Sequence, residues 1–149
     1  MDWLNEFYGK TIGIDTAPII YFIERGVYFR IMRSFFERLL EGHFRAITSA
    51  ITLLEVLVQP YRYENNHLLE EYKEILLYAD NLSIVPVSIE IADKAAELRA
   101  RYKVRTPDAI QVATAIHGEA SIFLTNDKTL KKIQEIKVII LFDMKRSMI

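Results

Sequence analysis

Four carboxylic acids lie just after predicted strands or near the beginnings of predicted helices, and they are the residues of this chain best suited to chemistry: Asp15, Glu55, Asp108 and Asp127. Carboxylate oxygens without Cys or His partners suit hard cations such as Mg²⁺ or Mn²⁺, and not Zn²⁺. A cluster of like charges is stable mainly when a cation compensates the repulsion. Such a cation can orient and activate water and can stabilise charge on a phosphodiester oxygen during in-line attack. If the four acids converge, they favour metal-assisted phosphodiester hydrolysis.

Asp108 belongs to the segment 105–115, which reads RTPDAIQVATA. Thr106 is a candidate N-cap and Pro107 suits the first helical position, which places Asp108 in the first turn, where free N–H groups favour negative charge. Apolar residues cover most of the remaining circumference and leave a narrow polar stripe of Asp108, Gln111 and Thr114. The helix is therefore expected to be buried. Taken alone, Asp108 is explained equally well as an acid that stabilises the helix dipole.

Asp15 and Asp127 also have structural alternatives. Asp15 follows the β-branched run 11–14, and it could cap the helix predicted to begin at Thr16. Asp127 follows the apolar run 121–124, and it could cap the short helix predicted around Leu130. Neither acid by itself demonstrates a metal site.

Glu55 has two possible settings. The pattern Thr52-x-x-Glu55 matches a capping box, which would place Glu55 in a first helical turn. A helix that begins at Ser49 instead places Glu55 well inside it, among apolar side chains. An acid in such surroundings needs a partner, and a metal ion would supply one.

Strands alternate with helices along the whole chain. The predicted strands are 11–14, 45–48, 82–85, 121–124 and 137–142. The predicted helices are 16–24, 28–41, 49–57 (closed by Gln59-Pro60), 66–80, 88–102, 106–116 and a short one near 130. This alternation indicates an α/β fold with a parallel sheet, right-handed crossovers and helices on both faces.

In such sheets a ligand binds beyond the carboxyl ends of the strands, at the point where strand order reverses. Asp15 and Asp127 follow the first and fourth predicted strands. If these strands are neighbours, all four acids can meet at one edge of the sheet. The composition of the chain does not require that adjacency.

The composition narrows the class of protein. With 149 residues, 51% of them hydrophobic and 26% charged, residues 1–149 are expected to form one globular domain. Nineteen basic and twenty acidic residues give a net charge of −1, so a nucleic-acid site would have to be local. The chain lacks cysteine, any apolar run near the ~20 residues of a membrane span, and a signal peptide, which predicts a cytoplasmic protein without a membrane partner.

Two other α/β classes lack residues that they require. A receiver-type phosphoacceptor domain would need an acidic pair after the first strand and a lysine at a strand end, and neither is visible. A nucleotide-binding Rossmann module would need a glycine-rich first turn, whereas residues 15–18 read DTAP.

In order and local context, the acids resemble the PIN-domain nucleases, which include the VapC toxins of bacterial and archaeal toxin–antitoxin pairs. The resemblance covers nearly the whole chain and rests on IGIDT at 12–16, SxxTxxE at 49–55, DxxxVA at 108–113 and TND at 125–127. It implies a three-layer sandwich with five parallel strands in the order 3-2-1-4-5. It also implies an endoribonuclease that binds Mg²⁺ or Mn²⁺ through Asp15, Glu55, Asp108 and Asp127, with support from Thr16, Thr125 and Asn126.

The resemblance leaves the biological role open. A cognate antitoxin is a possible partner, but the same fold serves housekeeping RNA processing, and a catalytically silent interaction domain is the rival outside the enzymes. Basic residues that flank the acids are candidates for RNA contact, although each is also explained as ordinary solvated charge: Arg99, Arg101, Lys103, Arg105, Lys128, Lys131 and Lys132. Aromatic residues of the second predicted helix exceed what one sheet face readily covers, which predicts a homodimer: Tyr28, Phe29, Phe35 and Phe36.

Overall fold

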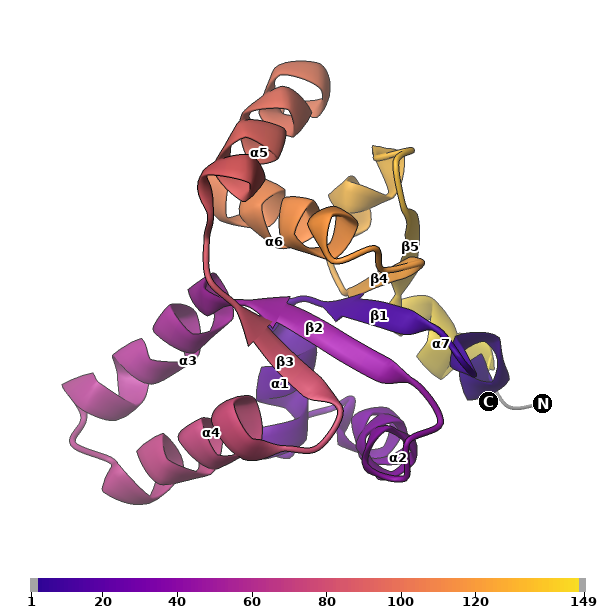
Figure 1. Ribbon diagram of the computed structural model, residues 1–149. Coiled ribbons are helices and arrows are strands. Elements are labelled where there is room, and N and C mark those ends of the chain that lie inside the picture. The colour runs from indigo at the N-terminus through magenta and orange to yellow at the C-terminus, as the bar shows by residue number, and fades with distance from the viewer. Residues whose placement is uncertain (1–2, 148–149) are drawn as a thin grey trace.

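The computed structural model describes residues 3–147, with the side chains of residues 3–144, and its framework is one parallel β-sheet (Figure 1). The strands are β1 (Thr11–Ile14), β2 (Arg45–Ser49), β3 (Leu82–Val85), β4 (Ile122–Thr125) and β5 (Lys137–Ile140). They lie in the order β3-β2-β1-β4-β5, and every neighbouring pair is parallel. The predicted α/β class and strand order are therefore confirmed.

Helices form a layer on each face of the sheet (Figure 1). One layer contains α1 (Thr16–Ile23), α2 (Phe29–Leu40), α3 (Ala50–Arg62) and α4 (Asn66–Tyr78), joined at its margin by the 3₁₀ helix η1 (Trp3–Phe7) and by α7 (Leu141–Ser147). The other contains α5 (Ile89–Tyr102), α6 (Thr106–His117) and the 3₁₀ helix η2 (Lys128–Lys132). Within residues 3–147, no helix has the length and apolar character needed to span a membrane.

The strands supply side chains to two separate cores because successive residues point to opposite faces. Ile122 and Leu124 of β4 belong to the core under α1 and α2, whereas Phe123 between them belongs to the core under α5 and α6. All four residues of β4 are buried, as expected for a central strand covered on both faces.

A glycine in β1 allows α6 to approach the sheet closely. A Cβ atom at Gly13 would lie 2.4 Å from the Cβ of Ala115 on α6, well inside van der Waals contact. The pairing of these two small residues therefore sets the distance between α6 and β1, and with it the position of the polar residues that α6 carries.

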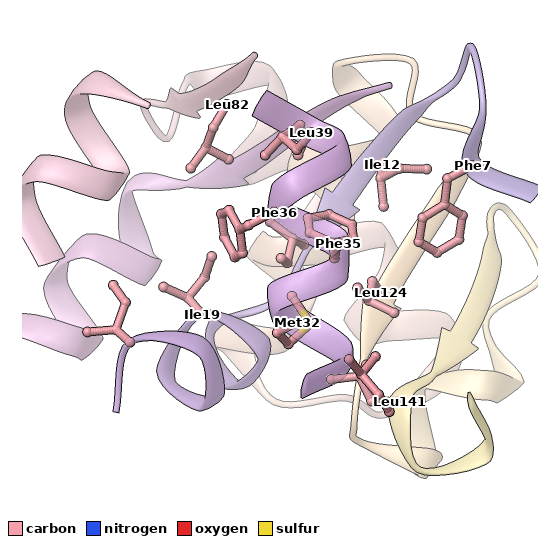
Figure 2. Close-up of a cluster of buried hydrophobic side chains, with 14 of the residues drawn as sticks. Phe7, Ile12, Ile19, Met32, Phe35, Phe36, Leu39, Leu82, Leu124 and Leu141 are labelled. Carbon is pink, nitrogen blue, oxygen red and sulfur yellow. The ribbon is translucent and has the colours of Figure 1, made fainter. Parts of the chain in front are cut away.

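The aromatic residues behind the homodimer prediction lie in and just before α2, and the chain itself covers them in part. Phe35 and Phe36 are 0% and 2% exposed and lie at the centre of the core in Figure 2. Tyr28 packs on Tyr21 and Phe29 stacks on Phe22, with ring centroids 4.8 and 6.0 Å apart. Phe35 and Phe36 therefore need no second copy of the chain to cover them, whereas Tyr28 and Phe29 are only partly buried, and the homodimer stays a prediction.

Two predicted boundaries are also wrong. The helix expected to close at Gln59-Pro60 continues to Arg62, with Pro60 buried in its last turn, where a proline forfeits only one backbone hydrogen bond. The fifth strand ends at Ile140 instead of residue 142, since the chain turns into α7 at Leu141. The Asn126 side chain accepts a hydrogen bond from the N–H of Phe142 at 2.9 Å and so holds the start of that helix.

Candidate active site

The pairing of β1 with β4 brings two of the predicted acids to one edge of the sheet. Ile14 lies opposite Leu124, and the N–H of Asp15 extends the ladder by donating to the carbonyl of Leu124 at 3.0 Å. Strand order reverses here, because β2 lies on one side of β1 and β4 on the other. This is the location at which doubly wound sheets bind ligands.

A cleft of about 540 Å³ opens at this edge. All four predicted acids line it, together with the three predicted supporting residues and one arginine: Asp15, Glu55, Asp108, Asp127, Thr16, Thr125, Asn126 and Arg105. Ala17, Ile20 and Tyr21 of α1 form its remaining wall. The tertiary structure thus places side chains from α1, α3, α6 and the end of β4 around one cavity.

Asp15 is the most buried acid of the cleft, with 9% of its surface exposed. It caps α1 through a hydrogen bond from the N–H of Thr16 to Oδ1 at 2.8 Å, and its Oδ2 accepts from the hydroxyl of Thr125 at 2.7 Å. Burial raises the pKa of Asp15 to about 6; these hydrogen bonds oppose the rise, while the charges of Asp108 and Glu55 add to it. Asp15 is therefore both a helix cap and part of an acidic cluster.

Glu55 lies in the second turn of α3, because Ser49 is the N-cap and its hydroxyl accepts from the N–H of Ile51 at 3.1 Å. The capping-box alternative is thus wrong. The expected apolar surroundings are also wrong, since Glu55 is exposed and its neighbour Leu54 is 61% exposed. Glu55 is instead held at the cleft by the hydroxyl of Thr16, which donates to Oε1 at 2.6 Å.

Asp108 lies in the first turn of α6, on a helix that is buried as predicted. Its cap differs from the prediction: Arg105 is the N-cap residue, Thr106 is already helical, and no side chain caps the helix. Asp108 accepts a hydrogen bond at Oδ2 from Nε of Arg105 at 3.1 Å, and its side chain is only 13% exposed. It is a partly buried acid that lines the cleft, and Arg105 is its cationic partner among the described residues.

Asp127 follows β4 and caps η2, as its structural alternative predicted. Its Oδ1 accepts from the backbone N–H of Thr129 at 3.0 Å and from the Thr129 hydroxyl at 2.6 Å. Its own N–H donates to the hydroxyl of Thr125 at 3.1 Å. The capping role does not remove Asp127 from the cleft, which it lines.

The donor set of the cleft fits a hard divalent cation. Hydrogen bonding to Asp108 raises the pKa of Arg105, and the charges of Asp108, Asp127 and Glu55 add to that rise, so the field of the cleft favours positive charge. Within residues 3–144, no three acidic or imidazole side chains are close enough to ligate one ion directly. Mg²⁺ commonly binds proteins through one or two carboxylates and keeps several waters. The wide cleft suits that mode of binding.

Three buried polar residues behind the cleft were not assigned a role from the sequence: Thr48, Thr52 and Gln111. The amide nitrogen of Gln111 donates to the hydroxyls of Thr16 and Thr52 at 3.0 and 2.6 Å. Gln111 was recognisable as part of the polar stripe of its helix, and Thr52 as part of the SxxTxxE pattern. No local pattern indicated that these two side chains meet.

Asn126 links elements around the cleft and makes no hydrogen bond to its acids among the described residues. Its side chain donates to the hydroxyl of Tyr21 at 3.3 Å and accepts from the N–H of Phe142. It thereby joins the end of β4 to α1 and α7. Its supporting role is to hold the walls of the cleft.

Of the predicted RNA contacts, Arg105 alone lines the cleft. Arg99 donates to the carbonyl of Val104 at 2.9 Å, and Arg101 pairs with Glu135 at 2.8 Å. Lys103 ends α5 in a left-handed conformation. Lys128 lies over the ring of Phe142, with Nζ 4.3 Å from the centroid, and Lys131 is 3.9 Å from Asp143.

Several solved structures share this fold. A toxin–antitoxin complex from Klebsiella pneumoniae contains a chain 26% identical to this one, with a TM-score of 0.65 over 88% of this chain and 97% of that one. VapBC2 from Rickettsia felis, bound to a DNA fragment from its promoter, is 18% identical, with a TM-score of 0.68 over 87% and 97% of the two chains. FitAcB from Neisseria gonorrhoeae is 19% identical, with a TM-score of 0.66 over 89% and 98%. No curated protein matches this sequence.

The sequence matches the PIN domain family over residues 12–136. The matched region contains all four cleft acids and runs from β1 to the residue before β5. Together with the predicted strand order and the acidic cleft at the β1–β4 edge, this match shows that the chain belongs to the PIN domain family.

Proposed function

We propose that this protein is a metal-dependent endoribonuclease that hydrolyses RNA phosphodiester bonds. The observation that carries the proposal is the gathering of four acids, Asp15, Glu55, Asp108 and Asp127, around one cleft at the switch point of the sheet. The raised pKa of Asp15 reflects burial near other acids, an arrangement that a bound cation would stabilise. A purely structural origin explains single acids, but not four around one cavity.

The four acids would hold Mg²⁺ or Mn²⁺, directly or through water. When bound, the cation would supply Lewis-acid activation of water and stabilise negative charge on the scissile phosphate. The hydroxyl of Thr16 holds the carboxylate of Glu55, and the hydroxyl of Thr125 holds that of Asp15, before the ion binds. Arg105, at the cleft wall beside Asp108, is suited to bind a phosphate oxygen of the substrate.

Single-stranded or looped RNA is the proposed substrate. In such regions the backbone is unstacked and can enter a cleft at a sheet edge, whereas a regular duplex holds its phosphates at fixed spacing. The net charge of −1 gives no general attraction for nucleic acid, so binding would depend on the cation and on Arg105.

We infer further that the protein is a VapC-like toxin with a cognate antitoxin, acting in the cytoplasm. The Klebsiella pneumoniae protein that supports this inference is part of a toxin–antitoxin complex. A small upstream gene that encodes a DNA-binding antitoxin would support the toxin role. An isolated gene among RNA-processing genes would favour the housekeeping alternative.

The direct test is cleavage of a labelled single-stranded RNA by the purified protein. We expect cleavage in millimolar Mg²⁺ or Mn²⁺, none in excess EDTA, and a loss of activity of at least 100-fold in Asp15→Asn, a range typical of lost electrostatic stabilisation. Asp93→Asn, which changes an exposed acid of α5, is the matched control. Cleavage that persists in EDTA would contradict the metal dependence. Absence of cleavage under all conditions would favour a silent interaction domain.

A further inference from the structure

Behind the cleft, three hydroxyl groups and one amide form a buried hydrogen-bonded network. Its members are Thr16 of α1, Thr48 of β2, Thr52 of α3 and Gln111 of α6, and none is more than 8% exposed. The network therefore joins four elements through polar contacts inside the protein. It reaches the cleft at one point, where the hydroxyl of Thr16 donates to Oε1 of Glu55 at 2.6 Å.

Each threonine hydroxyl has one hydrogen, and the surrounding acceptors define where each hydrogen points. Thr48 donates to the carbonyl of Ile14 at 2.8 Å, so its oxygen accepts the hydrogen of Thr52, 2.8 Å away. The hydrogen of Thr16 is directed to Glu55. The hydroxyl oxygens of Thr16 and Thr52, 3.1 Å apart, consequently face each other with no hydrogen between them.

Gln111 supplies the hydrogen-bond donors that these two oxygens lack. Its amide nitrogen carries two hydrogens and lies 3.0 Å from Oγ1 of Thr16 and 2.6 Å from Oγ1 of Thr52. The orientation of the amide follows from its oxygen, which accepts from the N–H of Ser49 at 3.4 Å; the reversed amide would place two donors against each other. Without Gln111, the oxygens of Thr16 and Thr52 would face each other at 3.1 Å with no hydrogen between them. Turning or moving the Thr16 hydroxyl would relieve this repulsion at the expense of its bond to Glu55.

We propose that Gln111 is a positioning residue, which keeps the Thr16 hydroxyl directed at Glu55 and thereby holds this carboxylate in place for a metal ion in the cleft. The inference rests on the proposed function, because it assumes that Glu55 contributes to the metal site. Glu55 is an exposed side chain, and Thr16 is its hydrogen-bond partner among the described residues. Loss of that bond would release it to several rotamers.

The test replaces Gln111 by methionine, which has a similar volume and no N–H groups. Thermal unfolding without RNA, over a Mn²⁺ titration, measures the concentration that gives half of the metal-induced rise in Tm. Removing a residue that orients a metal ligand typically lowers metal affinity 10–100-fold. We therefore expect Gln111→Met to raise the half-saturation concentration of Mn²⁺ about 10-fold or more. The control is Thr114→Val, which removes a buried hydroxyl one turn along α6 that bonds the carbonyl of Ile110. It should leave the half-saturation concentration unchanged.

A double-mutant cycle tests whether Gln111 acts through Thr16. If it does, Thr16→Val raises the half-saturation concentration by itself, and adding Gln111→Met causes no further rise. Thr16→Ser keeps the hydroxyl and should keep the dependence on Gln111. Two independent, additive effects would overturn the proposed route.

The outcomes separate this inference from the proposed function. A wild-type protein without any metal-induced rise in Tm would overturn the metal site and the role of Gln111 together. A normal wild-type rise that Gln111→Met retains in full would overturn the role of Gln111 alone. If Gln111→Met does not fold, Gln111→Asn keeps the amide but withdraws its N–H groups by about one bond length, ~1.5 Å. An unchanged metal response in that variant would also overturn the inference.

Discussion

The hydroxyl of Thr125 donates to Oδ2 of Asp15 at 2.7 Å, across the junction between β4 and β1. The hydroxyl oxygen of Thr125 also accepts from the backbone N–H of Asp127 at 3.1 Å. Its hydrogen is therefore committed to Asp15, while its lone pair holds the turn that carries Asp127. One buried side chain thus fixes the relative position of two cleft acids that are far apart in the sequence.

We expect Thr125→Val to raise the pKa of Asp15 above its value of about 6, because the Thr125 hydrogen bond lowers it. The variant should also lose about 1–2 kcal/mol of stability, since a buried carboxyl group loses a donor. NMR titration of the Asp15 carboxyl carbon and chemical unfolding measure the two effects. Thr129→Val removes a hydroxyl that bonds Asp127 on the exposed side and should not change the titration of Asp15. An unchanged Asp15 titration in Thr125→Val would contradict the prediction.

The raised pKa of Asp15 predicts a pH dependence of stability in the metal-free protein. The folded-state pKa of about 6 exceeds the ordinary value of 3.8, so folding favours the protonated acid. Its contribution is present below about pH 4 and is lost as the pH rises through 6. Asp15→Asn, which mimics the neutral acid, should match wild type near pH 4 and exceed its stability at pH 7 by on the order of 2–3 kcal/mol.

Urea unfolding of both proteins in EDTA at several pH values measures this difference. Asp93→Asn should show no such divergence from wild type, because Asp93 is exposed on α5, outside the cleft. Millimolar Mg²⁺ should reduce the stability advantage of Asp15→Asn at pH 7, since wild type gains from binding and Asp15→Asn does not. A constant difference at all pH values would show that the acidic cluster does not govern the stability of the apoprotein.

Asp108→Asn separates a metal ligand from an acid that serves only the helix dipole. A dipole role predicts a loss of about 0.3–1 kcal/mol with or without metal. A metal role predicts that wild type gains on the order of 1–3 kcal/mol from metal at tens to a hundred times Kd, while Asp108→Asn gains much less. Thermal unfolding in EDTA and in millimolar Mn²⁺ measures both. If the variant keeps the full metal-induced rise, Asp108 is not part of the site.

Gly13→Ala should disturb the cleft from within β1, two residues before Asp15. Its new Cβ would lie 2.4 Å from the Cβ of Ala115, so α6 must shift and carry Asp108 and Gln111 with it. Overpacking of this kind costs roughly 1–3 kcal/mol, and we expect reduced metal affinity as well. Gly26→Ala is the control, because its Cβ would make only ordinary contacts of 3.7 Å or more. Wild-type stability in Gly13→Ala would show that the contact between β1 and α6 is not tight.

Arg105→Gln should weaken RNA binding, and the binding that remains should depend less on salt concentration than that of the protein with Arg105. For single-stranded nucleic acid, each lost phosphate contact reduces the slope of log Kd against log salt concentration by about 0.7. Arg101→Gln is the matched control, since Arg101 pairs with Glu135 and does not line the cleft. Binding is measured by fluorescence anisotropy with the inactive Asp15→Asn protein as background. Equal effects of the two substitutions would argue against a specific role for Arg105.

Neighbouring residues in the sequence were enough to predict the secondary-structure elements and the acids of the candidate site. Apolar strands, caps and helical periods are local, so the five strands and most helix boundaries could be predicted from neighbouring residues. The resemblance of four short motifs to PIN domains also predicted the strand order, which the pairing of β1 with β4 confirms. Asp15 and Asp127 could be placed at strand ends for the same local reason.

How these residues meet depends on the packing of segments that are distant in the sequence. Glu55 was expected among apolar neighbours but is exposed, because burial depends on which face of α3 other elements cover. Pro60 remains helical in a buried last turn, and α7 begins at Leu141, where Asn126 bonds the N–H of Phe142. The role of Gln111 depends on hydroxyl groups of α1 and α3 that lie 95 and 59 residues away along the chain. Such contacts arise when packing brings distant segments within hydrogen-bond range, and no local pattern records that distance.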